Sequence, residues 1–249
     1  MTVTREEPRW AEAGWERLAP GVGRLRLPVW DCTAGLVAGP AGALLVDAGS
    51  SPAEGTRLRE ETGRLLGGGR RVTHLALTHA HFDHVFGASA FADAEVFGAV
   101  GLDAVLAHGR EELRADAVRN GQDPGVAREA ADALLLPRLS GASAVDLGGG
   151  LSAVPVGVGP GHTSHDLAVV VRSTSPGSRP VVFCGDLVEE SGEPQAGLDA
   201  VPSHWPAALD RLLALGGEEA VYVPGHGAAV DAAFVRAQRD ALTRRFGVP

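Results

Sequence analysis

The sequence predicts an α+β fold in one large domain. Short apolar segments of strand type and longer segments of helical pattern occur in both halves of the chain, and polar residues follow several of the strands. No linker separates the halves, and 249 residues are enough for one substantial core. We therefore expect residues 1–249 to form a single domain whose polar strand ends face one cleft.

The first half of the chain carries strand signals around one clear helix. Strand patterns lie at residues 24–30, at 35–48 as a hairpin around Gly39-Pro40-Ala41-Gly42, and at 72–77. Ser51 and Pro52 are typical of a helix start, and we expect this helix to end near Leu66, before three glycines. Residues 1–20, which include Trp10 and Trp15, are interpreted as an N-terminal strap.

The second half repeats the arrangement of strands followed by helices. Strands are expected at residues 94–98, 144–147, 151–156, 167–171, 180–183 and 220–223. Helices are expected at residues 101–136 as two or three pieces interrupted at 121–125, at 203–215 with Ser203 as N-cap, and at 231–245. Within this half, residues 99–140 form a predicted helical insert that supplies one wall of the substrate pocket.

Composition and charge narrow the range of partners. The formal net charge is −9 and no run of basic residues tracks a phosphate backbone, so we expect no nucleic-acid partner. No apolar stretch approaches 18 residues and no signal peptide is evident, which predicts a cytoplasmic protein without a membrane partner. Two cysteines, Cys32 and Cys184, are too few for a disulfide framework, although a single bridge stays open.

Four potential metal ligands fall within six residues after the apolar segment 72–77. They are His79, His81, Asp83 and His84. Imidazole and carboxylate together suit zinc, manganese or iron, and the lack of thiolate argues against a closed structural zinc site. Packing these groups together without a cation would be electrostatically costly, so a catalytic metal site is favoured over a solvated loop.

Three later motifs complete a constellation that resembles the metallo-β-lactamase superfamily, in its glyoxalase II-like branch. They are His162 in Gly-His-Thr, Asp186 in Cys-Gly-Asp and His226 in Pro-Gly-His-Gly, and the resemblance runs from about Leu44 to Gly227. It implies a four-layer αββα sandwich, in which two mixed β-sheets pack face to face with helices on the outer faces. It also implies a dinuclear metal site along one edge.

The resemblance assigns the ligands to two metals. His79, His81 and His162 would hold the first, Asp83, His84 and His226 the second, and Asp186 would bridge them. The implied cofactors are two Zn²⁺, with Mn²⁺ or Fe²⁺ as alternatives. A water between two such ions loses a proton near neutral pH and becomes the nucleophile. Asp83 is the candidate catalytic residue for handling the proton.

Two further residues are expected to support the ligands. Asp47 matches the family's first-strand aspartate and would brace the histidine loop, although a strand-end turn residue is the simpler alternative. His165 follows the His162 turn, where hydrogen bonding within the loop is favoured over a direct part in catalysis. Cys184, before Gly185-Asp186, is interpreted as a packing residue.

The leading functional hypothesis is a metal-dependent hydrolase that cleaves an ester, thioester or lactone bond of a small molecule. The bridging aspartate disfavours antibiotic hydrolysis, and only 249 − 226 = 23 residues follow His226, which puts a glutathione thioester in doubt. Acyl-homoserine lactonases carry a tyrosine soon after the bridging aspartate, where this chain reads Leu187-Val188-Glu189-Glu190. Alternatives are an iron persulfide dioxygenase-like enzyme, a phosphodiesterase or nuclease, and a non-catalytic scaffold. A homo-oligomer is left open.

Overall fold

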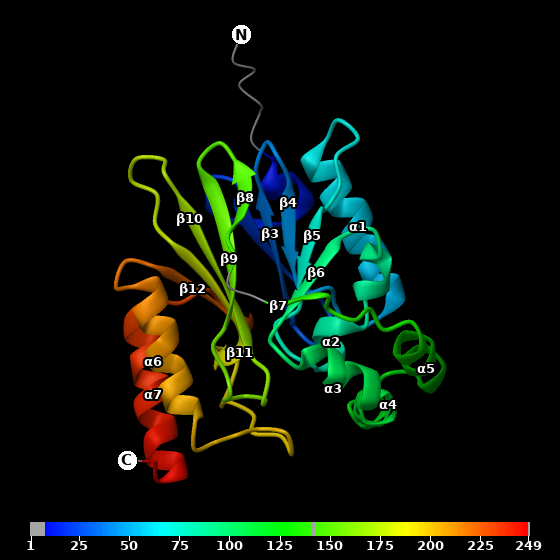
Figure 1. Ribbon diagram of the computed structural model, residues 1–249, viewed down its shortest axis with the longest axis vertical. Coiled ribbons are helices and arrows are strands. Elements are labelled where there is room, and N and C mark those ends of the chain that lie inside the picture. Colours follow the sequence, from blue (N-terminus) through cyan, green and yellow to red (C-terminus); the bar gives the residue numbers. More distant parts are fainter. Residues whose placement is uncertain (1–7, 141–142, 249) are drawn as a thin grey trace.

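Two mixed β-sheets pack face to face in the computed structural model, which describes residues 8–140 and 143–248 (Figure 1). The first sheet has the order β1-β2-β3-β4-β5-β6-β7, antiparallel up to β4 and parallel beyond it. Its strands are β1 (Glu16–Ala19), β2 (Val22–Arg26), β3 (Thr33–Ala38), β4 (Ala43–Val46), β5 (His74–Ala76), β6 (Glu95–Gly98) and β7 (Leu139–Ser140).

The second sheet has the order β12-β11-β10-β9-β8. Its strands are β8 (Val145–Gly148), β9 (Leu151–Gly157), β10 (Leu167–Ser173), β11 (Val181–Glu189) and β12 (Val221–His226). Neighbours are antiparallel except β11 and β12, which run parallel. Because β11 and β12 are parallel, their carboxyl ends meet at one edge of the sheet.

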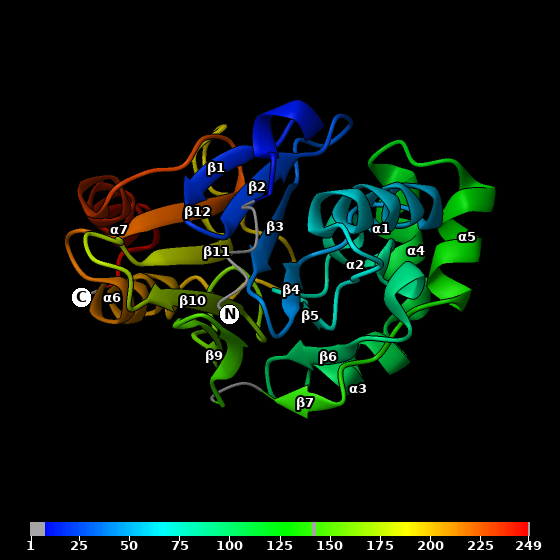
Figure 2. The ribbon, with the colours of Figure 1, turned by 90° about the horizontal axis from the view of Figure 1, so that it is seen from above.

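Helices cover the outer face of each sheet, so the fold has four layers, αββα (Figure 2). The first sheet is covered by α1 (Pro52–Leu66), α2 (Phe82–Val85), α3 (Leu102–His108), α4 (Arg110–Arg119) and α5 (Pro124–Asp132), with the 3₁₀ helices η1 (Trp10–Ala13) and η2 (Ala88–Phe91). The second is covered by α6 (Trp205–Gly216) and α7 (Ala232–Phe246). Among the described residues, no helix is both long and apolar enough to cross a membrane.

The core consists of three apolar layers that match this architecture. One layer joins the first sheet to α1–α5, a second fills the space between the sheets, and a third lies between the second sheet and α6 and α7. The sheets approach so closely that a Cβ on Gly35 of β3 would lie 2.3 Å from the Phe183 ring of β11. This tight contact fixes the relative position of the loops at the sheet ends.

The predicted helix starts and ends are confirmed for two of the three main helices. Ser51 caps α1 by accepting a hydrogen bond from the Glu54 N–H at 3.2 Å, and Asp231 caps α7 in the same way through Phe234 N–H at 2.9 Å. The prediction of Ser203 as the α6 N-cap is wrong. The residue at that position is His204, and the Ser203 hydroxyl is bonded to the His204 ring instead of a helix N–H.

The strand prediction at 180–183 is too short. The apolar run continues past Gly185 to Glu189, so Asp186 lies within β11 instead of after it. The ladder to β12 is irregular on both sides of Gly185, whose φ of +53° is a backbone conformation that favours glycine. The strand therefore bulges at the position that aims Asp186.

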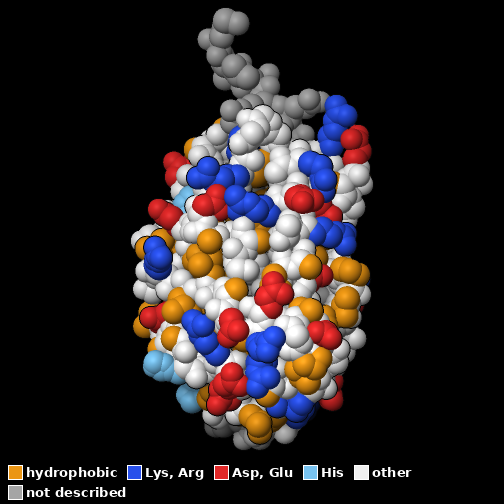
Figure 3. Space-filling model, turned by 90° about the vertical axis from the view of Figure 1, so that its right-hand side faces the viewer, with side chains coloured by type: hydrophobic (Ala, Val, Ile, Leu, Met, Phe, Trp, Pro, Cys, Tyr) orange, Lys and Arg blue, Asp and Glu red, His pale blue; other side chains and the backbone are white. Residues whose placement is uncertain are grey.

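The predicted N-terminal strap and the predicted helical insert both contribute to the apolar layer beside the first sheet. Residues 1–7 of the predicted strap lie outside the described residues, while Trp10 and Trp15 are buried with ring centroids 6.2 Å apart. The predicted helical insert 99–140 contains α3, α4 and α5, which lie on the outer side of the first sheet. On this face, basic and acidic side chains are interspersed among the described residues (Figure 3).

Candidate metal centre

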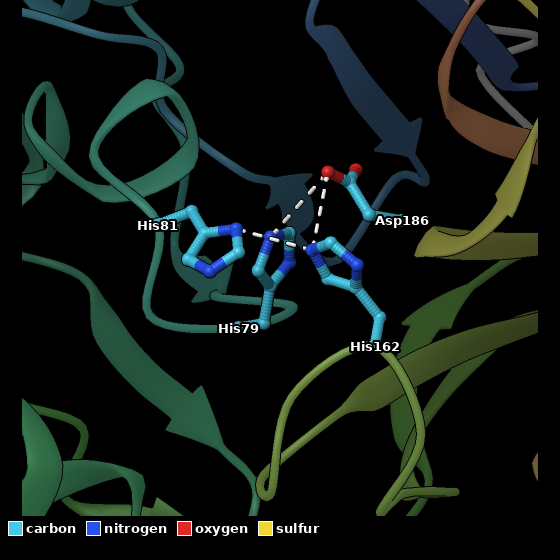
Figure 4. Close-up of side chains that lie close together, drawn as sticks. All are labelled: His79, His81, His162 and Asp186. Atoms are coloured by element: carbon cyan, nitrogen blue, oxygen red, sulfur yellow. Dashed lines mark hydrogen bonds and ion pairs between the residues drawn. The ribbon is translucent and has the colours of Figure 1, made fainter. Parts of the chain in front are cut away.

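Three histidines and one aspartate from separate loops and strands converge at one edge of the sheets (Figure 4). His79 and His81 lie on the loop after β5, His162 on the loop between β9 and β10, and Asp186 on β11. The Nε2 atoms of His79 and His162 lie 3.6 and 3.5 Å from Asp186 Oδ2. We call these four residues the first cluster.

Asp83, His84 and His226 form a second cluster beside the first. Asp83 and His84 lie on α2, and His226 is the last residue of β12. The His226 Nε2 atom lies 3.4 Å from Asp83 Oδ2 and 3.4 Å from Asp186 Oδ2, and His84 Nε2 lies 3.2 Å from Asp186 Oδ1. Asp186 thus contacts both clusters, and all seven residues predicted as ligands are brought together.

A glycine of the neighbouring strand leaves room for the Asp186 carboxylate. A Cβ on Gly225 would lie 1.8 Å from Asp186 Oδ1, so no larger residue fits before His226 without moving the carboxylate. This explains the glycine in Pro224-Gly225-His226, and it shows that the close approach of β11 and β12 places Asp186 between the two clusters.

Asp47 orients a histidine in each cluster. Its Oδ1 accepts from the Thr78 N–H, and its Oδ2 accepts from the Thr78 hydroxyl and from His84 Nδ1, each at 2.8 Å. Because the Thr78 hydroxyl donates to Asp47, it accepts from His79 Nδ1 at 2.9 Å. Asp47 adopts φ +58°, a conformation that aspartate tolerates better than most residues.

Backbone carbonyls and one carboxylate hold the remaining rings. His162 Nδ1 donates to Gln195 O at 3.1 Å and His226 Nδ1 donates to Trp30 O at 2.8 Å. His81 Nε2 donates to Asp199 Oδ2 at 3.1 Å. In its neutral form, each of the five histidines therefore uses one N–H outward, and its other nitrogen presents a lone pair to the site.

These inward lone pairs fit a cation. His162 Nε2 and His81 Nδ1 face each other at 3.1 Å, although neither needs a hydrogen in its neutral tautomer. His79 Nε2 and Asp186 Oδ1 are buried and have no hydrogen-bond partner. Buried polar atoms of this kind are rare without a ligand. The donor atoms of each cluster lie within 4.8 Å of one another, so the His/Asp site is able to bind metal.

The electrostatics of the two clusters differ. Burial lowers the pKa of His162 to about 4 and also depresses that of His79. Burial would lower the pKa of His226 as well, but its hydrogen bonds to Asp186 and Asp83 outweigh this and raise the pKa to about 11. The pKa of Asp83 is lowered, since the His84 charge and the His226 hydrogen bond overcome its burial.

The loop that carries His162 is closed by a buried aspartate. Asp166 Oδ1 accepts from the Thr163 N–H at 2.9 Å and from the Thr163 hydroxyl at 2.7 Å. Burial raises the Asp166 pKa to about 7. His165, predicted to support the ligands, bonds Ser164 Oγ at 2.7 Å and lies beside Gly101. His165 therefore forms hydrogen bonds within its own loop.

Three residues near the clusters were missed or underused by sequence reasoning. Glu189 lies with Asp186 and His226 in a third group of potential ligands, Asp199 bonds His81, and the Cys32 thiol lies 3.5 Å from His84 Nδ1. Cys32 and Cys184 are both free and buried, so they form no bridge, and Cys184 packs in the core under α6 and α7 as expected. The sequence did contain a signal for Glu189, since a carboxylate at the end of the buried, mostly apolar segment of β11 is unusual.

The fold and the paired clusters define a metal-binding αββα protein. The profile of the metallo-β-lactamase superfamily matches residues 27–226, which is most of the chain. The chain therefore belongs to the metallo-β-lactamase superfamily, whose members are generally hydrolytic metalloenzymes.

Two curated relatives share parts of the sequence. Hydroxyacylglutathione hydrolase from Cupriavidus metallidurans is 43% identical over 63 residues, which cover 25% of this chain and 23% of that protein. Metallo-beta-lactamase domain-containing protein 1 from Xenopus laevis is 30% identical over 158 residues, covering 63% and 54%. The chain thus spans about a quarter and about half of the lengths of these relatives.

Solved structures share the fold across nearly the whole chain. The mono-zinc form of the metallo-β-lactamase FIM-1 from Pseudomonas aeruginosa has a TM-score of 0.64 at 20% identity, covering 94% of this chain and 96% of that one. A metallo-β-lactamase from Hirschia baltica has a TM-score of 0.62 at 16% identity, covering 92% and 96%. At these identities, the likeness establishes the αββα architecture.

Proposed function

We propose that the chain is a dinuclear, zinc-dependent hydrolase that cleaves an ester, thioester or lactone bond of a small molecule. The observation that carries this proposal is the convergence of five inward histidine nitrogens on the buried Asp186 carboxylate, whose Oδ1 atom has no hydrogen-bond partner. When bound, two divalent cations would supply a hydroxide nucleophile at neutral pH and polarise the scissile carbonyl.

The proposed ligand assignment follows the two clusters. His79, His81 and His162 would hold one cation, Asp83, His84 and His226 the other, and Asp186 would be shared, since its oxygens lie within 3.6 Å of donors in both clusters. Neutral imidazoles bind zinc well, and Asp47, Gln195 and Trp30 already fix their tautomers. Mn²⁺ or Fe²⁺ are alternatives for the same donors.

Asp83 is the proposed group that handles the proton. Its Oδ2 atom lies beside His226 Nε2, and the lowered pKa keeps the carboxylate ionised and able to accept a proton from an attacking water. The side chain is only 12% exposed, so water screens its charge poorly.

A small acyl compound is favoured as substrate on charge and on relationship. A net charge of −9 supports neither a nucleic-acid nor an anionic membrane partner. The relative from Cupriavidus metallidurans, which is 43% identical over 63 residues, is named as a hydrolase of hydroxyacylglutathione. That match covers a quarter of the chain, so we place thioesters first and lactones second among candidates. The proposed compartment is the cytoplasm.

The experiment that tests this function is metal analysis followed by a substrate screen. We expect about two equivalents of zinc per chain, with turnover of thioesters or lactones that is lost on chelation. His81→Ala should lose the activity and keep the fold, whereas His108→Ala, at an exposed position of α3, should leave activity unchanged. One equivalent of iron with oxygen consumption on a persulfide, or turnover of phosphodiesters alone, would replace this proposal.

A further inference from the structure

Glu189 places a further carboxylate against the second cluster. It is the last residue of β11, three positions after Asp186, and it pairs with His226 in the ladder between β11 and β12. Its side chain is only 8% exposed. A Glu189 oxygen, an Asp186 oxygen and a His226 nitrogen lie within 4.8 Å of one another.

The position of Glu189 is fixed from two sides. The Ser191 hydroxyl donates to Glu189 Oε1 at 2.5 Å. The Glu189 N–H donates to the Gln238 side chain of α7 at 3.0 Å, and the same Gln238 amide donates to Leu187 O at 2.8 Å. The carboxylate is therefore held beside His226 by α7 and by the turn after β11.

The charge balance at this point calls for a cation. The second cluster contains two imidazoles and the buried carboxylate of Asp83, and two further buried carboxylates, those of Asp186 and Glu189, lie beside its His226. Several carboxylates are seldom buried together without a paired positive charge or a metal. Independently, Asp186 Oδ1 is buried and lacks a hydrogen-bond partner, as is typical of an oxygen that binds a metal.

We propose that Glu189 is a further donor at the second metal position and that it shifts the selectivity of that position toward Mn²⁺. This inference rests on the proposed dinuclear function. The first position has three imidazoles and one shared carboxylate, whereas the second has two imidazoles and the carboxylates of Asp83 and Asp186, with Glu189 grouped beside Asp186 and His226. Imidazole suits zinc, and carboxylate oxygen suits manganese, so the ratio of Mn²⁺ to Zn²⁺ affinity is higher at the second position.

The test is a manganese titration of protein that already holds one equivalent of zinc, with free Mn²⁺ followed by electron paramagnetic resonance. We expect wild type to bind one Mn²⁺, and Glu189→Gln to bind it about tenfold or more weakly with its zinc content unchanged. Glu189→Asp keeps the negative charge but moves the carboxylate oxygens away from the site, so we expect this variant to bind Mn²⁺ more weakly as well. The matched control Glu193→Gln, at an exposed position of the following turn, should behave as wild type.

The outcomes separate this inference from the function beneath it. Wild-type Mn²⁺ affinity in both the Gln and the Asp variant would overturn the role of Glu189 and leave the dinuclear hydrolase standing. Weak binding in Glu189→Gln with full binding in Glu189→Asp would also overturn it, because charge alone would then explain the effect. A wild-type protein that accepts no second cation would overturn both proposals.

Discussion

The two clusters contain the same kinds of side chain but differ in what surrounds them. In the first, His79 and His162 face mainly other histidines, and burial depresses the pKa of each ring. In the second, burial opposes protonation, but the Cys32 sulfur followed by Asp186 and Asp83 raises the pKa of His84, and Asp186 and Asp83 raise that of His226. The rings of His79 and His162 are therefore neutral, whereas His84 and His226 form ion pairs with carboxylates; His81, at the outer side of the first cluster, has its pKa raised by Asp199.

This difference means that protons on the rings balance the carboxylates around His84 and His226 and are not needed around His79 and His162. A cation entering the second cluster must displace protons, whereas one entering around His79 and His162 finds these donors already in their binding form. The supports differ as well. The second cluster is held by the buried Asp47 and by the half-buried Trp30 carbonyl, and the first cluster is held partly by the exposed segment around Asp199.

Removing the shared Asp186 carboxylate should impair metal binding at both clusters and have the largest effect of all. In Asp186→Asn, both positions lose an anionic donor, so we expect loss of bound metal and a fall in kcat/KM of about 10³-fold or more, equivalent to about 4 kcal/mol of transition-state stabilisation. Metal analysis and an activity assay measure this, with circular dichroism as the check on folding. Retention of both metals and full turnover would contradict the assignment of Asp186.

Raising the pH should tighten the second position far more than the first. The His226 pKa of about 11 means that a proton is bound at neutral pH, and its displacement makes affinity rise about tenfold per pH unit. We expect about 100-fold tighter binding between about pH 6.5 and about pH 8.5. In the first cluster, His162, with a pKa of about 4, and His79, whose pKa is also lowered, release no proton in this range, so His81, whose pKa Asp199 raises, is the one ring of that cluster with a proton to displace. Calorimetric titrations in buffers of different ionisation enthalpy count the protons released, and equal counts for the two cations would refute the contrast.

Much of this site could be predicted because its signals are local. His79 to His84 follow one apolar segment within a few residues, and Ser51, Pro52 and Gly67 mark α1 without help from the rest of the chain. The three later ligands could be assigned only through the family resemblance, since they lie on separate elements. The parallel ends of β11 and β12 then bring Asp186 and His226 together.

The supports of the ligands could not be predicted, because they are long-range. His226 bonds the Trp30 carbonyl 196 positions away, and Asp199 reaches His81 across 118 positions. Neither contact leaves a periodic pattern in the sequence. The bulge at Gly185 also hides a contact from the sequence, because the predicted strand ends before Asp186 whereas β11 continues to Glu189. In the sequence, Glu189 therefore stands out only as a departure from the lactonase pattern.

Weakening the brace of the second cluster should cost less than losing a ligand. Asp47→Asn keeps the size and tolerates φ +58°, but it replaces a carboxylate that accepts three hydrogen bonds, including one from His84. We expect about 10- to 100-fold weaker metal binding, mainly at the second position. A chelator competition assay measures the two affinities, and an unchanged second affinity would show that His84 does not depend on Asp47.

Weakening the brace of the first cluster should have the smallest effect. The Asp199 side chain is 47% exposed, so water screens its bond to His81 and can replace it in Asp199→Ala. Since exposed ion pairs contribute about 0.2 to 1 kcal/mol, we expect the first zinc affinity to fall only about two- to fivefold. Glu193→Ala, which removes an exposed carboxylate of the same segment, controls for the change in local charge. If Asp199→Ala weakened metal binding as much as Asp47→Asn does, the exposed segment would hold His81 as firmly as the buried aspartate holds His84. The two clusters would then differ in protonation alone.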